Sequence, residues 1–321
     1  MNTNEIFDFY RSHTVFTEDD MADFRVYVQD PVNITDGLMA IAGLTLNLLE
    51  NPWSEDNLMM MLTSCDGISP ECFERVVVGL LLVMIQHDDA VRRDRVLLGE
   101  IQEVLTYAPE LSFTALCNIA RTTQMKRMEQ FNQQLTQELL PLMNDRANNE
   151  FYDIIRSRQS EMEHIAQLCL DQNFLVFREF YSTPFFRQQA SNWLLPWSED
   201  ALLSVDEDNR QDVESLLELW SMCDSDKYAL CHCYKTFESM IKSQLSIDSL
   251  REAGIGMQSH AIVTNGYIQQ LYRFYRLAPS SLSSPRKNNV FSLASNLRNL
   301  LVYRLVVVGE KAKNTINELL A

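Results

Sequence analysis

The stretch SPECFERVVVGLLLVMIQHD, residues 69–88, decides the fold class. Ser69 followed by Pro70 is typical of a helix start, because serine caps the first turn and proline suits its first position. Residues 76–85 are then apolar, with charged or polar residues on both sides. This run is about half of the roughly 20 residues that a helix needs to cross a bilayer. We therefore expect a helix buried in the core of a soluble protein.

Apolar residues recur at helical spacing on both sides of this stretch. They share one face of residues 38–49, and from about Leu111 to Leu142 they step by threes and fours, which predicts a long surface helix that Pro141 ends or kinks. Nine glycines and nine prolines in 321 residues are too few for the frequent turns of an all-β fold. We expect an all-α fold of stacked antiparallel helix pairs, an α-solenoid-like superhelix.

A polar segment at residues 144–149 is the candidate boundary between two helical halves, residues 1–148 and 149–321. The chain ends on an amphipathic segment, which predicts that its apolar face packs onto the body of the protein or continues into a longer parent chain.

The sequence Pro-Trp-Ser-Glu-Asp occurs twice, at residues 52–56 and 196–200. Proline ends a helix, tryptophan covers the junction, serine caps the next helix, and the acidic residues suit its positive end. The repetition indicates either a two-unit repeat or, as we prefer, a shared solution for joining helices.

The net charge of −17 disfavours nonspecific binding to nucleic acid and to anionic membranes, since such binding needs lysine and arginine. No signal peptide is visible at the N-terminus. The seven cysteines form no regular framework and most have apolar neighbours, which favours reduced thiols in a cytoplasmic protein. They are Cys65, Cys72, Cys117, Cys169, Cys223, Cys231 and Cys233.

Candidate reactive groups are few. Cys231-His232-Cys233 lacks the spacing of a structural zinc site, and a helix would point its two cysteines in different directions, so core cysteines beside a partly exposed histidine are favoured. No catalytic motif, phosphate-binding loop or calcium loop occurs. We expect no catalytic residue, no metal and no cofactor.

Two passages carry a family resemblance. Residues 184–197, with Trp193, Pro196 and Trp197, resemble an F-F-x-x-x-x-N-W-[FL]-x-P-[FW] signature, and residues 223–231 resemble C-x-S-D-K-Y-x-[FL]-C. Together they resemble a group of large Bacteroidales-type proteins labelled as tetratricopeptide-repeat proteins. The resemblance implies that this chain is the N-terminal helical region of such a protein, with a superhelix of tetratricopeptide- or HEAT-like type and a role in protein interaction.

The second passage also reads as a helix start. Asp224 or Ser225 can cap, Asp226 suits the helix dipole, and Tyr228 begins the apolar face; a ligand patch that includes Lys227 is the alternative. Residues 266–279 interleave Arg273 and Arg276 with aromatic residues. This pattern occurs in binding surfaces, but an amphipathic core helix with its arginines in water is favoured.

The main hypothesis is a non-enzymatic interaction scaffold that binds a protein or peptide. Its candidate partner contacts are Trp193, Pro196, Trp197, Asp224, Asp226, Lys227, Tyr228, Arg273 and Arg276. One alternative is an enzyme whose site is assembled around Asp224, Asp226, Lys227 and His232. A nucleic-acid adaptor that uses Arg273, Arg276, Arg286 and Lys287 is disfavoured by the net charge.

Overall fold

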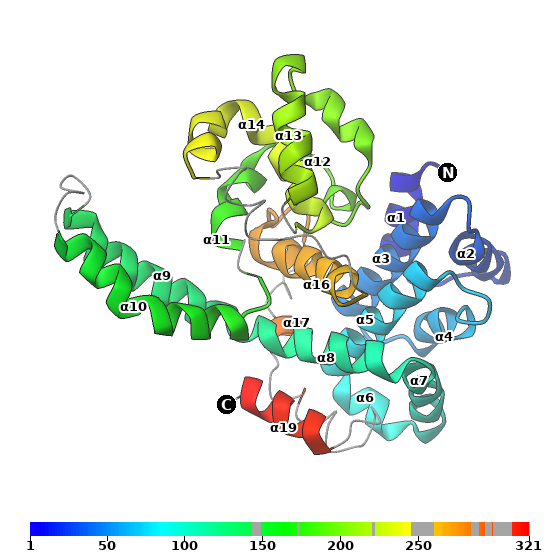
Figure 1. Cartoon of the computed structure of the whole chain (residues 1–321). Coiled ribbons are helices and arrows are strands. Elements are labelled where there is room, and N and C mark those ends of the chain that lie inside the picture. Colours follow the sequence, from blue (N-terminus) through cyan, green and yellow to red (C-terminus); the bar gives the residue numbers. More distant parts are fainter. Residues whose placement is uncertain are drawn as a thin grey trace.

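The computed structural model describes residues 1–142, 149–171, 174–219, 222–244, 260–283, 289–292, 297 and 310–320. Within these ranges all regular structure is helical and no strand occurs, which confirms the all-α prediction (Figure 1). The first group of helices comprises α1 (Thr3–Ser12), α2 (Glu18–Gln29), α3 (Ile34–Glu50), α4 (Glu55–Thr63), α5 (Pro70–Gln86), α6 (Asp88–Arg93), α7 (Arg95–Tyr107) and α8 (Pro109–Thr122).

The second group contains longer helices joined by short ones. Its α-helices are α9 (Met125–Leu139), α10 (Asn149–Leu168), α11 (Phe174–Phe177), α12 (Pro184–Gln188), α13 (Glu207–Leu219), α14 (Asp224–Gln244), α16 (His260–Leu277), α17 (Asn289–Ser292) and α19 (Glu310–Leu319). The short 3-10 helices are η1 (Leu140–Leu142), η2 (Arg178–Ser182), η3 (Ser191–Trp193) and η4 (Glu199–Ser204).

Helix α5 is the centre of the first group, as the apolar run predicts. The Ser69 hydroxyl accepts a hydrogen bond from the backbone N–H of Cys72, and Pro70 occupies the first turn. Every residue of 76–85 is buried against α3, α8 and α16. No helix in the described part of the chain is long and apolar enough to span a membrane.

Helices α1, α3 and α5 stack side by side in sequence order, with α2 also against α3. The α1–α3 crossing is close because Gly43 has no side chain: a Cβ atom there would collide with the carbonyl oxygen of Phe7. Arg75 of α5 ties further elements together, since its guanidinium donates to the carbonyls of Leu38 and Leu194 at 3.0 and 3.2 Å and lies over the ring of Tyr267.

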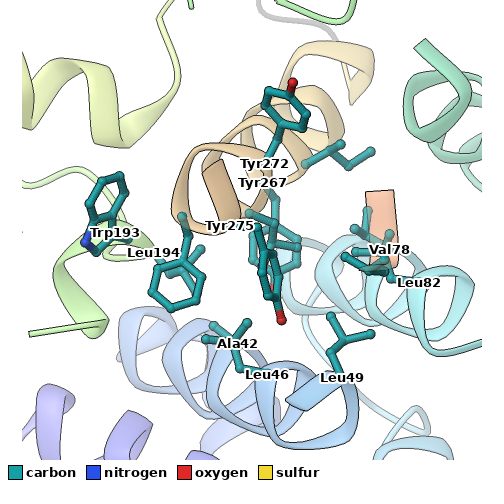
Figure 2. Packing of buried hydrophobic residues seen from close by; sticks show 14 of the residues in the cluster. Ala42, Leu46, Leu49, Val78, Leu82, Trp193, Leu194, Tyr267, Tyr272 and Tyr275 are labelled. Carbon is teal, nitrogen blue, oxygen red and sulfur yellow. The ribbon is translucent and has the colours of Figure 1, made fainter. Parts of the chain in front are cut away.

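Helix α16 closes the core although it lies far along the chain. It packs against α5, α8, α14 and η3. Figure 2 shows Tyr267 and Tyr275 of α16 beside apolar side chains of α3 and α5, with Trp193 and Leu194 on the other side. One apolar cluster therefore includes residues from both predicted halves. Of the predicted boundary, residues 144–149, only Asn149 lies within the described residues, where it begins α10.

The predicted long helix from Leu111 is divided in two. Helix α8 ends at Thr122 and α9 begins at Met125. The hydroxyls of Thr122 and Thr123 donate to carbonyls three residues earlier, at 2.6 and 2.7 Å, and the backbone N–H of Gln124 donates to Arg121 in the same tight pattern. Such bonds compete with the regular helical pattern, so the helix stops here.

After this break, α9 and α10 form an antiparallel hairpin that projects from the other helices (Figure 1). Contacts join the two helices at both ends of the hairpin. The carbonyl of Gln124 accepts a hydrogen bond from the Cys169 thiol, and Glu138 pairs with Arg158 at 2.5 Å. Beyond it, α19 lies along α8 with Ile316 and Leu319 buried, so the amphipathic C-terminal segment packs onto the body of the protein.

Both Pro-Trp-Ser-Glu-Asp segments lie at helix junctions. Ser54 caps α4 by accepting from the N–H of Asn57, and Ser198 caps η4 by accepting from the N–H of Asp200. The predicted capping role of serine is therefore confirmed at both sites, although the second helix is a short 3-10 turn.

Candidate functional site

Trp193 of η3, the first of the expected contact residues, lies in the core. Its side chain is fully buried and stacks on Tyr181 with ring centroids 5.0 Å apart. Its indole N–H donates to the carbonyl of Phe186 at 2.8 Å, so the one polar atom of the ring is satisfied. The side chain therefore holds η3 against its neighbours and offers nothing to a partner in this structure.

Asp226 and Arg273 form the centre of a buried polar cluster. Arg273 Nη2 lies 2.7 Å from Asp226 Oδ2, and Nη1 pairs with Asp171. The Tyr181 hydroxyl donates to Asp226 Oδ1 at 2.8 Å, and Ser225 Oγ lies 2.8 Å from the same hydroxyl. The cluster joins α14, α16, η2 and the segment after α10, which are far apart in the sequence.

Burial dominates the proton affinities in this cluster. It raises the pKa of Asp226 to about 6, against the opposing effect of Arg273, and it also raises the pKa values of Tyr181 and Cys223. For Arg273, burial favours the neutral form, but Asp171 and Asp226 outweigh it and raise the pKa. The arginine therefore stays charged, facing two carboxyl groups.

Two sequence expectations change here. Arg273 was expected on the side of α16 that faces water, and it is fully buried because two carboxyl groups compensate its charge. Asp224 and Ser225 were expected as caps, but α14 begins at Asp224, so both lie in its first turn. The Ser225 hydroxyl contacts Tyr181 instead of capping the helix.

The other signature residues meet at the edge of this region. Lys227 pairs with Asp224 at 3.2 Å, and its ammonium lies 5.8 Å from the centre of the Trp197 ring. The Tyr228 hydroxyl donates to the carbonyl of Pro196 at 2.9 Å, while its ring meets Trp197 edge-on. The two passages thus pack onto each other through Pro196, Trp197, Lys227 and Tyr228.

The basic residues of the nucleic-acid alternative do not form a described patch. Arg276 is partly exposed, as expected, and pairs with Glu129 of α9 at 3.2 Å. Arg273 is buried, and Arg286 and Lys287 lie outside the described residues.

Cys231 and Cys233 are buried core residues on α14, as the sequence predicts. Burial raises the pKa of each thiol to about 12. His232 between them is half-buried, stacks on Phe185, and has its pKa lowered by burial. Among the described residues no cluster of histidine, cysteine and carboxylate side chains has the arrangement of a metal site.

A groove formed by α4, α5, α7 and α8 has a volume of about 1250 Å³. The expected contact residues do not line it. Its apolar surface comes from partly buried or exposed side chains that continue the core outward. They include Met59, Ile68, Phe73, Val104, Tyr107 and Leu111.

Tyr107 is the most conspicuous of these side chains. It is the last residue of α7 and is 83% exposed, and its ring meets that of Phe73 edge-on at 5.7 Å. The chain turns sharply after it, because Ala108 leaves the helical conformation, with φ of −129° and ψ of 76°, and Pro109 begins α8. Ser112 fixes this corner by donating to the carbonyl of Leu105 at 2.8 Å.

The opposite rim is the loop between α4 and α5. Gly67 has φ of 71°, a conformation that other residues rarely adopt, and it allows the loop to fold back. Gln29 of α2 donates to the carbonyl of Asp66 at 2.6 Å, and the backbone N–H of Ser69 donates to Val28. These bonds hold the rim in place, so the groove is formed without a partner.

The polar lining of the groove is acidic. Asp66, Glu74, Glu100, Glu103 and Glu110 line it, and no lysine, arginine or histidine of the described part of the chain does. One cation reaches the rim, since Arg25 donates to the hydroxyl of Thr63 at 3.4 Å. Arg75 follows Glu74 in the chain, but its guanidinium is bonded in the core.

Sequence reasoning missed this groove, although α7 carries a signal for it. Glu100, Glu103, Val104 and Tyr107 are spaced by three, four and seven positions, so they share one helix face that is both acidic and apolar. The other three helices of the groove could not be placed beside α7 from sequence.

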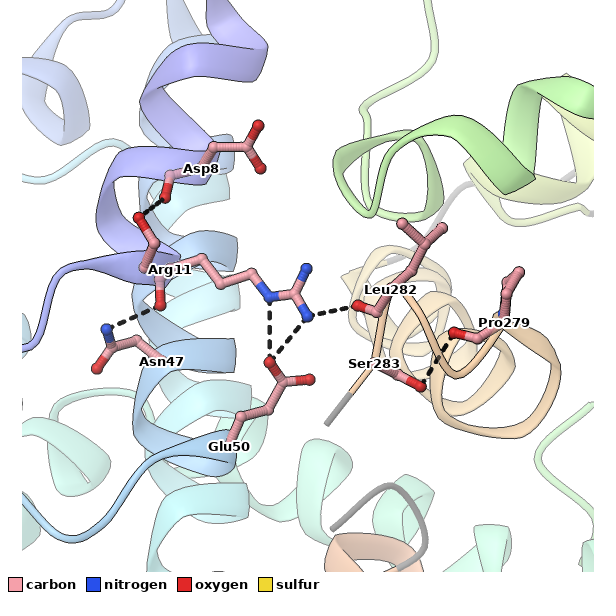
Figure 3. A network of polar contacts seen from close by, with 8 residues as sticks. Asp8, Arg11, Asn47, Glu50, Pro279, Leu282 and Ser283 are labelled. Carbon is pink, nitrogen blue, oxygen red and sulfur yellow. Dashed lines mark hydrogen bonds and ion pairs between the residues drawn. The ribbon is translucent and has the colours of Figure 1, made fainter. Parts of the chain in front are cut away.

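A second, smaller hollow of about 480 Å³ lies where the N-terminal helices meet the end of α16. Arg11 lines it: its Nε and Nη2 atoms donate to Glu50 at 3.1 and 2.9 Å, and Nη2 also donates to the carbonyl of Leu282 (Figure 3). These contacts serve the packing of α1 and α3 against the segment after α16.

Comparisons with known proteins give no relative: no family model, no curated protein and no solved structure matches the chain.

Proposed function

We propose that the chain is a non-enzymatic, cytoplasmic interaction scaffold that binds a segment of another protein in the groove between α4, α5, α7 and α8. The observation that carries the proposal is a groove with an apolar lining that is open among the described residues, with Tyr107 83% exposed at its edge. Its volume of about 1250 Å³ exceeds the roughly 300–1,000 Å³ of most small-molecule pockets.

The chemistry of the chain supports binding rather than catalysis. The cysteines are free, and where burial perturbs their proton affinity it raises the pKa, so these thiols are protonated at neutral pH. The buried cluster around Asp226 and Arg273 has perturbed groups, but neither of the two hollows is lined by its members. The resemblance to repeat proteins with an interaction role agrees with this proposal.

The test places a photoreactive amino acid in the groove. We expect p-benzoylphenylalanine in place of Tyr107 to form a covalent adduct with a discrete polypeptide when the native cell is irradiated. The matched control carries the same residue in place of Leu203, which is 74% exposed and does not line the groove. Equal adduct formation at both positions, or none at position 107, would contradict the proposal.

A further inference from the structure

We propose that the occupant of the groove is an amphipathic helix with lysine or arginine beside its apolar face. This inference rests on the proposed function and adds the chemistry of the partner. Five carboxylate side chains line the groove together with its apolar residues, and none of the lining residues is basic. A basic segment would bring cations to the four of these carboxylates that are exposed or partly exposed, Asp66, Glu100, Glu103 and Glu110, whereas an acidic segment would be repelled.

The side chains on α7 show how apolar and ionic contacts to one partner helix would combine. Val104 follows Glu100 by four residues and Tyr107 follows Glu103 by four, so each apolar side chain lies about one helical turn from a carboxylate on the same face. A partner helix that lays apolar side chains on Val104 and Tyr107 therefore brings flanking cations within reach of both carboxylates. The partner would carry apolar residues at every third or fourth position, with basic residues next to them.

A helix fits this groove better than an extended strand. The groove is bordered by helices, and the described part of the chain has no strand whose edge a partner strand could extend. A partner helix packed against α4 and α7 would cover apolar surface in the same way as the chain's own helices cover one another.

Long-range electrostatic attraction also favours a basic partner. The chain carries a net charge of −17, so a cationic segment is drawn towards it before contact. The net charge alone would attract such a segment to many places on the surface, which is why the test must separate the groove from the surface in general.

The probe is a fluorescein-labelled synthetic peptide of about 18 residues, with leucine at every third or fourth position and lysine beside the leucines. Binding to the full chain is measured by fluorescence anisotropy. We expect saturable binding that weakens when NaCl is raised from about 50 mM to about 500 mM, because surface charges are screened. A peptide with glutamate in place of each lysine should not bind.

The variant Glu100→Lys/Glu103→Lys should bind the lysine peptide about tenfold more weakly, since two attractive contacts become repulsive. The matched control is Glu214→Lys/Glu218→Lys on α13, which changes the net charge equally at exposed positions outside the groove. Its affinity should stay within about twofold of the original chain. Tyr107→Ala, which removes an exposed ring, should also weaken binding while leaving the melting temperature unchanged.

Three results would overturn the inference: equal binding of the glutamate peptide, unchanged affinity of the Glu100→Lys/Glu103→Lys variant, or an equal loss in the α13 control. A crosslinked partner at position 107 combined with any of these results would leave the scaffold proposal standing and remove only the assignment of a basic helix.

Discussion

Arg273 of α16 and Asp226 of α14 form an ion pair of 2.7 Å in which neither side chain is more than 1% exposed. Asp171 pairs with the same guanidinium, so one cation faces two carboxyl groups. Removing a charge from water costs several kcal/mol, and only the opposite charges and the hydrogen bonds nearby compensate for it. The cluster therefore holds α14 and α16 in one relative position.

We expect Arg273→Leu to lower the free energy of unfolding by about 3–5 kcal/mol, because two buried carboxyl groups lose their cation. Urea denaturation followed by circular dichroism measures the change. Arg276→Ala is the matched control on the same helix. Its partly exposed pair with Glu129 should contribute less than about 1 kcal/mol. Equal losses of unfolding free energy for the two substitutions would show that the buried ion pair contributes no more than the partly exposed one.

Asp226 should also make stability depend on pH. Its pKa is raised from 3.8 to about 6 in the folded chain, chiefly by burial, so between these values the folded state binds the proton that the unfolded state has released. Stability from this carboxyl is therefore present below about pH 4 and is lost as pH rises to about 6, by up to about 1.4 kcal/mol per pH unit.

Asp226→Asn isolates this contribution, because it keeps a partner for Tyr181 and leaves Arg273 with one carboxylate. The other groups that face Asp226 are Asp171, Tyr181 and Cys223. The unfolding free energy of the original chain minus that of the variant should fall between about pH 4 and about pH 6 and then stay level. Parallel pH profiles for the two proteins would refute the assignment.

Gly43→Ala should destabilise the chain by about 1–3 kcal/mol, because the added methyl group meets the Phe7 carbonyl at the α1–α3 crossing. Gly99→Ala is the control within another helix. Nothing lies within 4 Å of its Cβ position, so alanine should stabilise α7 by about 0.5–1 kcal/mol. Thermal melting of both variants distinguishes close packing from helix propensity, since propensity alone would raise both melting temperatures.

The thiols of α14 should be unreactive in the folded chain. Cys231 and Cys233 are buried, and burial raises the pKa of each to about 12, so little thiolate is present at about pH 8. Mass spectrometry after iodoacetamide treatment should find both unmodified without urea and modified in urea. Rapid modification of either in the folded chain would contradict the observed packing.

Features of the fold that are set by residues close together in the sequence could be predicted. The start of α5 follows from Ser69 and Pro70, and its burial follows from the apolar run 76–85. The break between α8 and α9 was missed, because two threonines that bond to their own helix look the same in sequence as threonines that do not.

The buried cluster around Arg273 and the groove are formed by residues that are distant in the chain. Less of these two sites could therefore be predicted from the sequence. It named Asp226 and Arg273, yet the burial of Arg273 follows from Asp171 and Asp226, which lie 102 and 47 positions away in the numbering. The groove needs four helices in contact, and only the face of α7 carried a local signal.

The central place of α16 has a consequence for the way the chain is made. A ribosome produces α3 and α5 first, and the helix that packs between them and η3 follows about 170 residues later. At roughly 5–20 residues per second, the interval lasts roughly 10–35 s. Until α16 is made, this helix cannot cover the apolar side of α5, and apolar surface exposed in this way favours aggregation of a nascent chain.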